Sequence, residues 1–146
     1  MRTLIILHLL STLMMTGVIW FVQIVHYPLF AEVGPDQFTQ YEGLHVRWTG
    51  YIVGPLMLLE LGSGLLLFLG MEGSNRWWIG GAMVALGLIW LSTFFLQVPL
   101  HGQISQGFDL AAIKRLVSTN WIRTILWSLR AGILLYLVSG WLKIKV

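Results

Sequence analysis

The stretch Trp48–Gly70, WTGYIVGPLMLLELGSGLLLFLG, decides the fold of this chain. It carries a single charged residue, Glu60, and as a helix it is long enough to cross a hydrocarbon core of about 30 Å, which takes about 20 residues. Three more apolar runs of similar length occupy residues 3–27, 77–98 and 121–142. We therefore predict an all-α fold, an integral membrane bundle of four transmembrane helices, with residues 1–146 in one domain.

The composition agrees with a membrane protein. The chain is 57% hydrophobic and 10% charged and contains eight tryptophans, which is typical of segments that face lipid and its interfaces. The net charge of +3 comes without a basic run, so nucleic acid is not a predicted partner. The lack of cysteine excludes disulfides, thiolate catalysis and thiolate metal sites. The predicted partner is the lipid bilayer, and other membrane subunits or a homo-oligomer are left open.

Two opposite charges fall near the middle of two of these runs. Glu60 lies in the second run and Arg130 in the fourth. An ionisable residue at membrane depth is costly, so it is normally paired or functional. The second and fourth helices run in the same direction, so the two side chains can meet at similar depth. We predict a buried ion pair that fixes helix register; the alternative is a proton relay or a ligand-binding carboxylate tuned by Arg130.

Prolines predict where the first and third helices end. Proline lacks a donor and disfavours helix in the residue before it, so the first helix should stop near Tyr27, before Pro28, and the third near Pro99. The segment Pro35–His45 then reads as a short helix lying on the bilayer. This arrangement gathers polar residues at one side of the membrane, namely Gln23, His26, Glu42, His45, Arg47, Gln97, His101, Asn120 and Arg123.

This polar mouth is the candidate site. Imidazoles suit iron, copper, zinc or haem, so we consider a single transition metal held by His26, His45 and His101 with Glu42, or a haem held by two of these histidines beside Gln23 and Gln97. The Glu42-x-x-His45 spacing occurs in di-iron proteins, which need a second copy that this chain lacks. Arg47 and Arg123 would suit an anionic headgroup or a quinone-like oxygen. Plain interfacial hydrogen bonding and helix capping are the alternative.

The two halves of the chain resemble each other. Phe21-Val-Gln23-Ile aligns with Phe95-Leu-Gln97-Val at a spacing of 74, and Glu60-Leu-Gly62 aligns with Arg130-Ala-Gly132 at a spacing of 70. A duplicated helical hairpin would produce this pattern, and chance is the alternative.

Two family resemblances follow from these residues. The run Val22-Gln-Ile-Val-His-Tyr-Pro-Leu-Phe30, His45-x-Arg47 and a helix with Pro55 and Glu60 resemble a bacterial family of small four-helix membrane proteins. More distantly, the four short helices, the polar mouth and the Asn120-Trp121-x-Arg123 start resemble the anthrone-oxygenase-like membrane family. That second resemblance implies oxygen-dependent oxidation of an aromatic or quinol-like substrate near the bilayer surface, with His26, His45, Arg47 and Arg123 as candidate catalytic residues.

Two functions of different classes fit the sequence. The first is a membrane oxidoreductase or redox-cofactor-binding protein that acts on a lipophilic substrate at the mouth. The second is a non-catalytic accessory or scaffold subunit of a larger membrane complex, with Gly50 and Gly54, four residues apart, making helix contacts. We expect a multi-pass protein of the bacterial inner membrane. If Arg47 and Arg123 point into the bundle, the positive-inside rule favours cytoplasmic termini, on the balance of Arg2, Arg76, Lys143 and Lys145 against Lys114 and Arg115.

Overall fold

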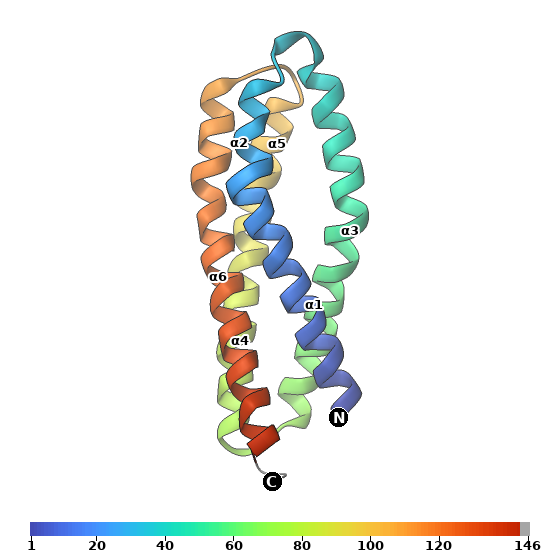
Figure 1. The fold of residues 1–146 in the computed structure, drawn as a ribbon, viewed down its shortest axis with the longest axis vertical. Coiled ribbons are helices and arrows are strands. Elements are labelled where there is room, and N and C mark those ends of the chain that lie inside the picture. The colour runs from blue at the N-terminus through green and yellow to red at the C-terminus, as the bar shows by residue number, and fades with distance from the viewer. Residues whose placement is uncertain (144–146) are drawn as a thin grey trace.

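The computed structural model describes the backbone of residues 1–143 and shows four long helical rods packed as an all-α bundle (Figure 1). The first rod comprises α1 (Arg2–Phe21), the π turn η1 (Val22–His26), α2 (Tyr27–Leu29) and the 3-10 turn η2 (Phe30–Glu32). The second rod is α3 (Pro35–Gly70). The third comprises α4 (Gly73–Ser92), the π turn η3 (Thr93–Gln97) and α5 (Val98–Ile104), and the fourth is α6 (Leu110–Lys143).

All four rods are long and apolar enough to cross a bilayer. Large apolar side chains also point outward along the bundle, as shown by exposed fractions of 79% for Trp77, 73% for Phe95 and 67% for Tyr51. Such a continuous apolar surface is rare on soluble monomers and suits contact with lipid. The chain is therefore a multi-pass membrane protein, and Figure 1 places the start of α1 and the end of α6 at the same end of the bundle.

The helix ends predicted from proline are wrong. The first helix does not stop near Tyr27 but continues to Glu32, and the third does not stop near Pro99 but continues to Ile104. The second and fourth begin at Pro35 and Leu110, well before the predicted starts at 48 and 121. The segment 35–45 is thus the first part of α3 and not a separate surface helix.

The π turns explain how helices pass the two prolines. In a regular α-helix a proline ring collides with the carbonyl four residues earlier and leaves it without a donor. A π turn widens the helix locally, and membrane helices use such adjustments to tolerate proline. Here η1 ends two residues before Pro28 and η3 two residues before Pro99. The two turns lie 71 positions apart, so both halves share the plan that a duplication would produce, at a spacing different from the predicted 74.

The rods form a square in which neighbours are α1 with α3, α3 with α4, α4 with α6, and α6 with α1. Short connections enforce this arrangement, and Gly34, between the first two rods, has φ of +79°, a conformation that favours glycine. Two apolar core clusters fill the bundle, one around Ile89 and Trp127 and one around Leu67 and Leu134. A layer of buried polar residues separates them along each of α1, α3 and α6.

Asp109 caps α6 from outside the apolar spans. Its Oδ1 accepts a hydrogen bond from the backbone N–H of Ala112 at 3.0 Å, and its Oδ2 accepts one from Nε2 of Gln103 at 2.7 Å. The bond from Ala112 is the main cause that holds the pKa of Asp109 below its ordinary value, and the Gln103 bond adds to it.

Asp109→Ala should therefore lower the melting temperature at neutral pH. A lowered folded-state pKa stabilises the protein above the unfolded-state pKa of about 3.9, and this contribution is lost as the pH falls through the folded-state value. Thermal melts in detergent should show the difference between wild type and variant shrinking below about pH 4. A difference that stays constant down to pH 3 would contradict the capping role.

Candidate functional site

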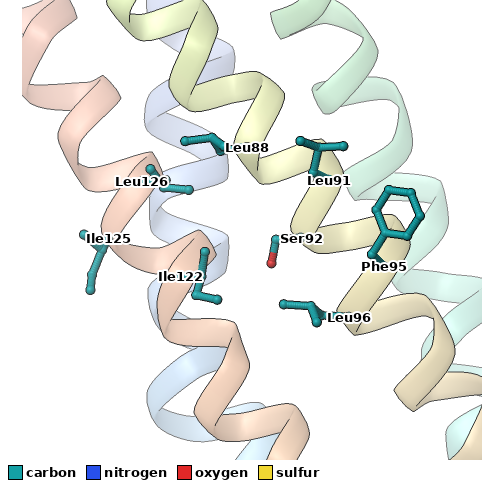
Figure 2. Close-up of a pocket in the computed structure, with 8 residues that line it drawn as sticks. All are labelled: Leu88, Leu91, Ser92, Phe95, Leu96, Ile122, Ile125 and Leu126. Atoms are coloured by element: carbon teal, nitrogen blue, oxygen red, sulfur yellow. The ribbon is translucent and has the colours of Figure 1, made fainter.

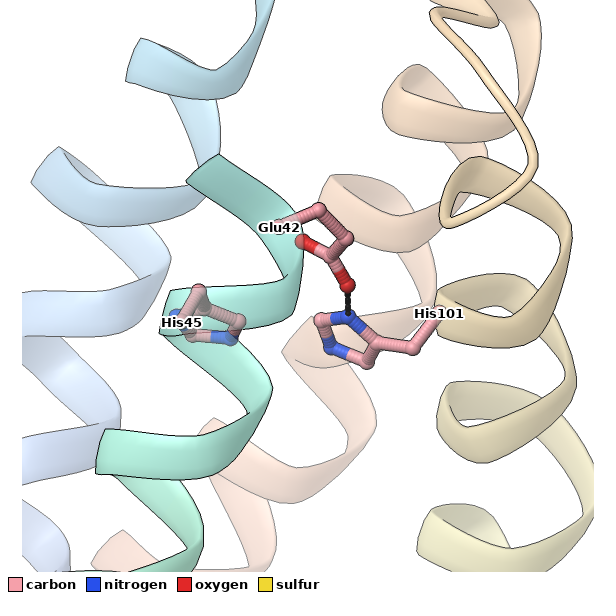
Figure 3. Close-up of side chains that lie close together, drawn as sticks. All are labelled: Glu42, His45 and His101. Atoms are coloured by element: carbon pink, nitrogen blue, oxygen red, sulfur yellow. Dashed lines mark hydrogen bonds and ion pairs between the residues drawn. The ribbon is translucent and has the colours of Figure 1, made fainter. Parts of the chain in front are cut away.

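Glu42, His45 and His101 come together near one end of the bundle, where each contributes one possible metal-ligating atom and these atoms lie within 4.8 Å of one another. Figure 3 shows Glu42 and His45 one turn apart on α3, facing His101 on α5. Glu42 is fully buried, His45 is buried and His101 is partly exposed. The passage of the third rod through Pro99 positions His101, because Pro99 lies in the first turn of α5 and His101 follows it on the same helix.

A hydrogen-bond chain runs through this group. Nδ1 of His101 lies 2.6 Å from Oε1 of Glu42, and the hydroxyl of Tyr27 lies 2.9 Å from Nε2 of His101. The Tyr27 oxygen in turn accepts from Nη2 of Arg123 at 3.2 Å. At the other end of the chain, Oε2 of Glu42 is buried and has no partner among the described residues. A buried carboxylate oxygen without a donor is unusual and points to a missing ligand.

His45 joins the group through a second chain. Its Nδ1 lies 2.7 Å from Nε2 of His26 and 3.1 Å from Oγ1 of Thr49. With Nδ1 protonated, His45 donates to His26 and keeps the lone pair of Nε2, which has no protein partner in the described part of the chain. Its ring stacks on that of His101 with centroids 5.2 Å apart and planes at 22°. His26 therefore orients His45 and stands behind the group as an outer-shell partner.

Arg123 is a buried cation without an anion. It is 6% exposed, and its Nε and Nη2 both donate to Oδ1 of Asn120, at 3.0 and 2.5 Å. Nη2 also donates to Oε1 of Gln97 at 3.2 Å. No carboxylate pairs with Arg123 among the residues that the structure describes. Its Nη1 has no hydrogen-bond acceptor there either.

The two predicted glutamines play different parts. Gln97 holds Arg123 and lines a cavity beside it. Gln23 is buried away from that cavity, where its Oε1 accepts from Nδ2 of Asn120 at 2.9 Å and its Nε2 donates to the carbonyl of Val117 at 3.1 Å. Gln23 thus anchors η1 to α6 and is not placed to bind a cofactor directly.

The cavity has a volume of about 490 Å³ and lies between α3 and the α4–η3–α5 rod. Its polar end is lined by Tyr27, His45, Thr49, Gln97, His101, Ser105 and Arg123, and its apolar end by residues that include Val53, Met57, Trp90 and Phe94. Because α3 and the third rod are antiparallel, the polar end lies toward the end of the bundle and the apolar end toward its middle. This volume is typical of small-molecule sites.

Arg47 does not take its predicted place, and Gly50 and Gly54 lie at the cavity. Arg47 is exposed and has no hydrogen bond or ion pair in the described region, so it does not point into the bundle. Gly50 and Gly54 line the cavity, and a Cβ built at either would meet no atom within 4 Å. They therefore bring no other described helix of this chain into close contact, and their contact with a partner subunit stays a prediction.

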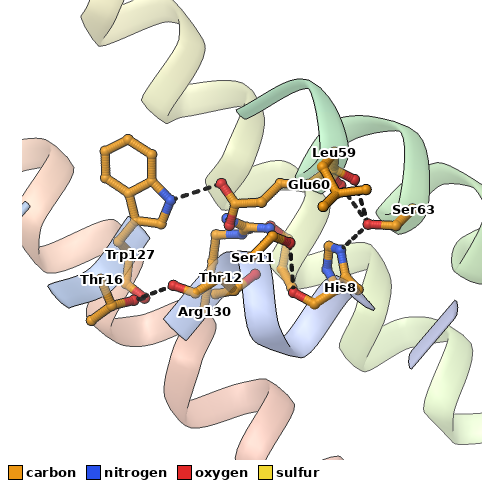
Figure 4. A network of polar contacts seen from close by, with 10 residues as sticks. His8, Ser11, Thr12, Thr16, Leu59, Glu60, Ser63, Trp127 and Arg130 are labelled. Atoms are coloured by element: carbon orange, nitrogen blue, oxygen red, sulfur yellow. Dashed lines mark hydrogen bonds and ion pairs between the residues drawn. The ribbon is translucent and has the colours of Figure 1, made fainter. Parts of the chain in front are cut away.

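Glu60 and Arg130 pair directly across the bundle, as Figure 4 shows. Both are fully buried; Nη1 of Arg130 donates to Oε1 of Glu60, and Nε1 of Trp127 donates to Oε2 at 3.0 Å. Nε of Arg130 donates to the carbonyl of Ala82 at 3.1 Å. His8 lies in the same layer, bonded to Ser63 at 2.8 Å and apart from the other three histidines. These contacts tie α3, α4 and α6 together, which is the arrangement of a structural link.

An apolar groove of about 590 Å³ runs between α4 and α6 (Figure 2). Its lining is aliphatic and aromatic apart from Ser92, whose Oγ has no partner among the described residues. It holds no titratable group and can accept an acyl chain or an apolar helix, but it offers no chemistry.

Sequence reasoning identified the three metal-type ligands but missed Tyr27 and Thr49. A signal for Thr49 was present, because Glu42, His45 and Thr49 occur at i, i+3 and i+7, the spacing of one helix face. Reading 35–47 as part of the same helix as 48–70 would have revealed that face. Arg47 would then have been placed about 200° around the helix from His45, on the outer surface.

The chain matches no protein-family model, no curated protein and no solved structure.

Proposed function

We propose that this protein is a membrane oxidoreductase in which Glu42, His45 and His101 hold one transition-metal ion beside a lipophilic, quinol- or aromatic-like substrate. The observation that carries the proposal is the approach of two imidazoles and one carboxylate within 4.8 Å at the polar end of the cavity. Two histidines and one carboxylate on one side of a metal leave coordination positions open, which is the ligand set of non-haem iron oxygenases. The distant anthrone-oxygenase resemblance favours the same class of reaction.

The local geometry suits a single ion. Ligand atoms at about 2.1 Å from a metal and at right angles to each other are about 3 Å apart. Nδ1 of His101 and Oε1 of Glu42 are already 2.6 Å apart, so both could bind one ion if the proton of His101 moved to Nε2, which would then donate to the Tyr27 hydroxyl. The His45 atom, which lies within 4.8 Å of the other two, would have to move closer. The unpartnered Oε2 of Glu42 offers a further donor atom. Such an ion supplies one-electron exchange with a substrate or with dioxygen.

A haem between two of these histidines fits poorly. His26 and His45 are joined by a direct 2.7 Å contact, and His45 and His101 stack nearly face to face. Axial histidines must instead point their nitrogens at each other from opposite sides of a porphyrin. Neither pair leaves space for the ring, so the proposal takes the single metal and not haem.

The surrounding side chains position Glu42, His45 and His101 and exclude water from them. His26 fixes the ring of His45, and Tyr27 fixes that of His101 from the side opposite Glu42. Phe30 is fully buried, and its ring packs edge-on against His45 with centroids 5.0 Å apart. Fixed ring orientations lower the cost of assembling a metal site, because little has to be ordered on binding.

Turnover tests the proposal. Iron-loaded wild type in lipid nanodiscs should oxidise a decyl-tailed hydroquinone to the quinone, with two electrons and two protons passing to one dioxygen to give hydrogen peroxide. Glu42→Gln should lower the rate by about 100-fold or more, because it removes a ligand and not merely an outer-shell partner. Glu72→Gln, at an exposed site near the other end of α3, is the matched control. Quinone absorbance and oxygen uptake measure the rate, and equal rates with and without iron, copper or manganese would contradict the proposal.

A non-catalytic accessory or scaffold role is the second candidate, favoured by the groove between α4 and α6. A subunit of a larger complex or a homo-oligomer would seat an apolar helix there. Native mass spectrometry from mild detergent separates the two: a metal-free chain bound stably to other subunits supports the scaffold, and a metal-bound monomer supports the enzyme.

We also propose residence in a bacterial inner membrane with both termini in the cytoplasm. The positive charges outside the bundle interior are divided between its two ends. Arg47, which is exposed, adds to Lys114 and Arg115 at the end that holds the site. The opposite side of the membrane is assigned Arg2, Arg76, Lys143 and Lys145, of which Lys145 lies outside the described residues. The remaining bias still favours cytoplasmic termini. A fluorescent protein fused to the C-terminus should therefore fluoresce, and a dark but stable fusion would contradict this orientation.

A further inference from the structure

Arg123 presents an unused donor to the cavity. Its Nε and Nη2 donate to the neutral partners Asn120, Gln97 and Tyr27, while Nη1 has no acceptor among the described residues. A guanidinium inside a membrane bundle is costly unless an anion or a strong acceptor meets it. The cavity is the open space that Arg123 lines, so the missing acceptor belongs to whatever occupies the cavity.

The cavity is shaped for a molecule with a polar head and an apolar tail. On α3 its lining runs from His45 to Met57, which is about 18 Å of helix. Every titratable side chain that lines it belongs to the polar end, beside Arg123. A volume of about 490 Å³ lies toward the small end of ligand sites and suits one ring with a short tail.

The cavity is also open to the bilayer along its side. Several lining residues face outward at the same time, with exposed fractions of 48% for Val46, 56% for Phe94 and 54% for Val98. Gly50 and Gly54 form the α3 side of this opening, and side chains there would project into empty space. Absence of side chains at these two positions thus keeps a lateral path from lipid to the polar end.

We propose that the cavity binds a tailed quinone or hydroquinone ring that arrives sideways from the bilayer past Gly50 and Gly54, with one ring oxygen accepting a hydrogen bond from Nη1 of Arg123. Arg123 is then a substrate-binding residue that sets the position of the ring beside His45 and His101. The redox identity of the ring rests on the proposed function. The place and polarity of the site rest on the cavity and on Arg123 alone.

The test is equilibrium binding of decyl-1,4-benzoquinone to metal-free protein in lipid nanodiscs, with empty nanodiscs as the blank. Arg123→Gln should weaken binding by about 10- to 100-fold, the range for a hydrogen bond to a charged group. Gly54→Leu should weaken it at least as much by filling the path. Gly62→Leu, at an exposed position of the same helix outside the cavity, should leave it unchanged.

A second ligand measures the contribution of the quinone oxygens to binding. Decylbenzene, which has the tail and ring but no oxygen, should bind weakly to wild type and equally to Arg123→Gln. Quinone binding that survives Gly54→Leu, or decylbenzene that binds as tightly as the quinone, would overturn the inference. Melting temperatures identify any variant that fails to fold. If Arg123→Gln does not fold, the comparison of Gly54→Leu with Gly62→Leu still tests whether the quinone binds in the cavity.

This assay separates the inference from the proposed function. Quinone binding that depends on Arg123 and Gly54 in a protein that takes up no metal would refute the metal centre and leave the binding site standing. A stoichiometric metal without quinone binding would do the reverse.

Discussion

Arg130→Gln is expected to destabilise the protein by about 3 to 5 kcal/mol, because it leaves the carboxylate of Glu60 buried without its counter-charge. Glu60 is fully buried and would keep only the Trp127 N–H as a donor, on Oε2. Glu60→Gln should cost a similar amount, since it strands the guanidinium of Arg130, which already has one unpartnered nitrogen, Nη2.

The double change Glu60→Gln with Arg130→Gln should be clearly more stable than either single change. Two neutral amides can bond to each other at the same place, and no charge then remains in the bundle interior. Denaturant or thermal unfolding in one detergent compares the four proteins directly. Equal stability of Arg130→Gln and the double variant would show that the pair contributes nothing to the fold.

The Glu60–Arg130 ion pair is a feature of the structure that could be predicted from the sequence. Charge alone marks Glu60 and Arg130 in their apolar runs, and the direction of successive helices brings the second and fourth to the same depth. Both inferences need only hydropathy and topology, which is also why the four spans could be predicted. Neither depends on where a helix ends.

The helix ends could not be predicted, because proline has two outcomes in a membrane helix. The sequence predicts helix ends at Pro28 and Pro99, whereas a π turn before each lets the helix continue. This difference carries His101 onto α5, and the separate early start of α3 at Pro35 sets Arg47 on the outer surface. The three ligand-type residues of the site could be predicted from the sequence, whereas its geometry and the place of Tyr27 in it could not.

His101→Ala is expected to abolish stoichiometric metal binding. The variant removes one of three proposed ligands and also leaves Glu42 buried without its one hydrogen-bond partner among the described residues. Removal of an outer-shell partner of a metal ligand typically lowers metal affinity by about 10- to 100-fold. His26→Ala, which acts through His45, should fall in that range, and His101→Ala and His45→Ala should lose more.

Chelator competition for iron(II) under anaerobic conditions measures this series. His8→Gln is the matched control, because His8 belongs to the polar layer around Glu60 and Arg130 and not to the site. Each variant is compared at equal folded fraction, judged by its melting curve. A loss in His8→Gln equal to that in His101→Ala would mean that the metal is bound elsewhere or nonspecifically.

The most direct measurement is elemental analysis of wild-type protein that has been loaded with iron(II) without oxygen and then desalted, beside a Glu42→Gln, His45→Ala, His101→Ala triple variant. A metal centre at the polar end of the cavity predicts about one iron per chain in the wild type and none in the triple variant. Folded wild type that retains no iron, copper or manganese, or a triple variant that retains as much as wild type, would contradict it.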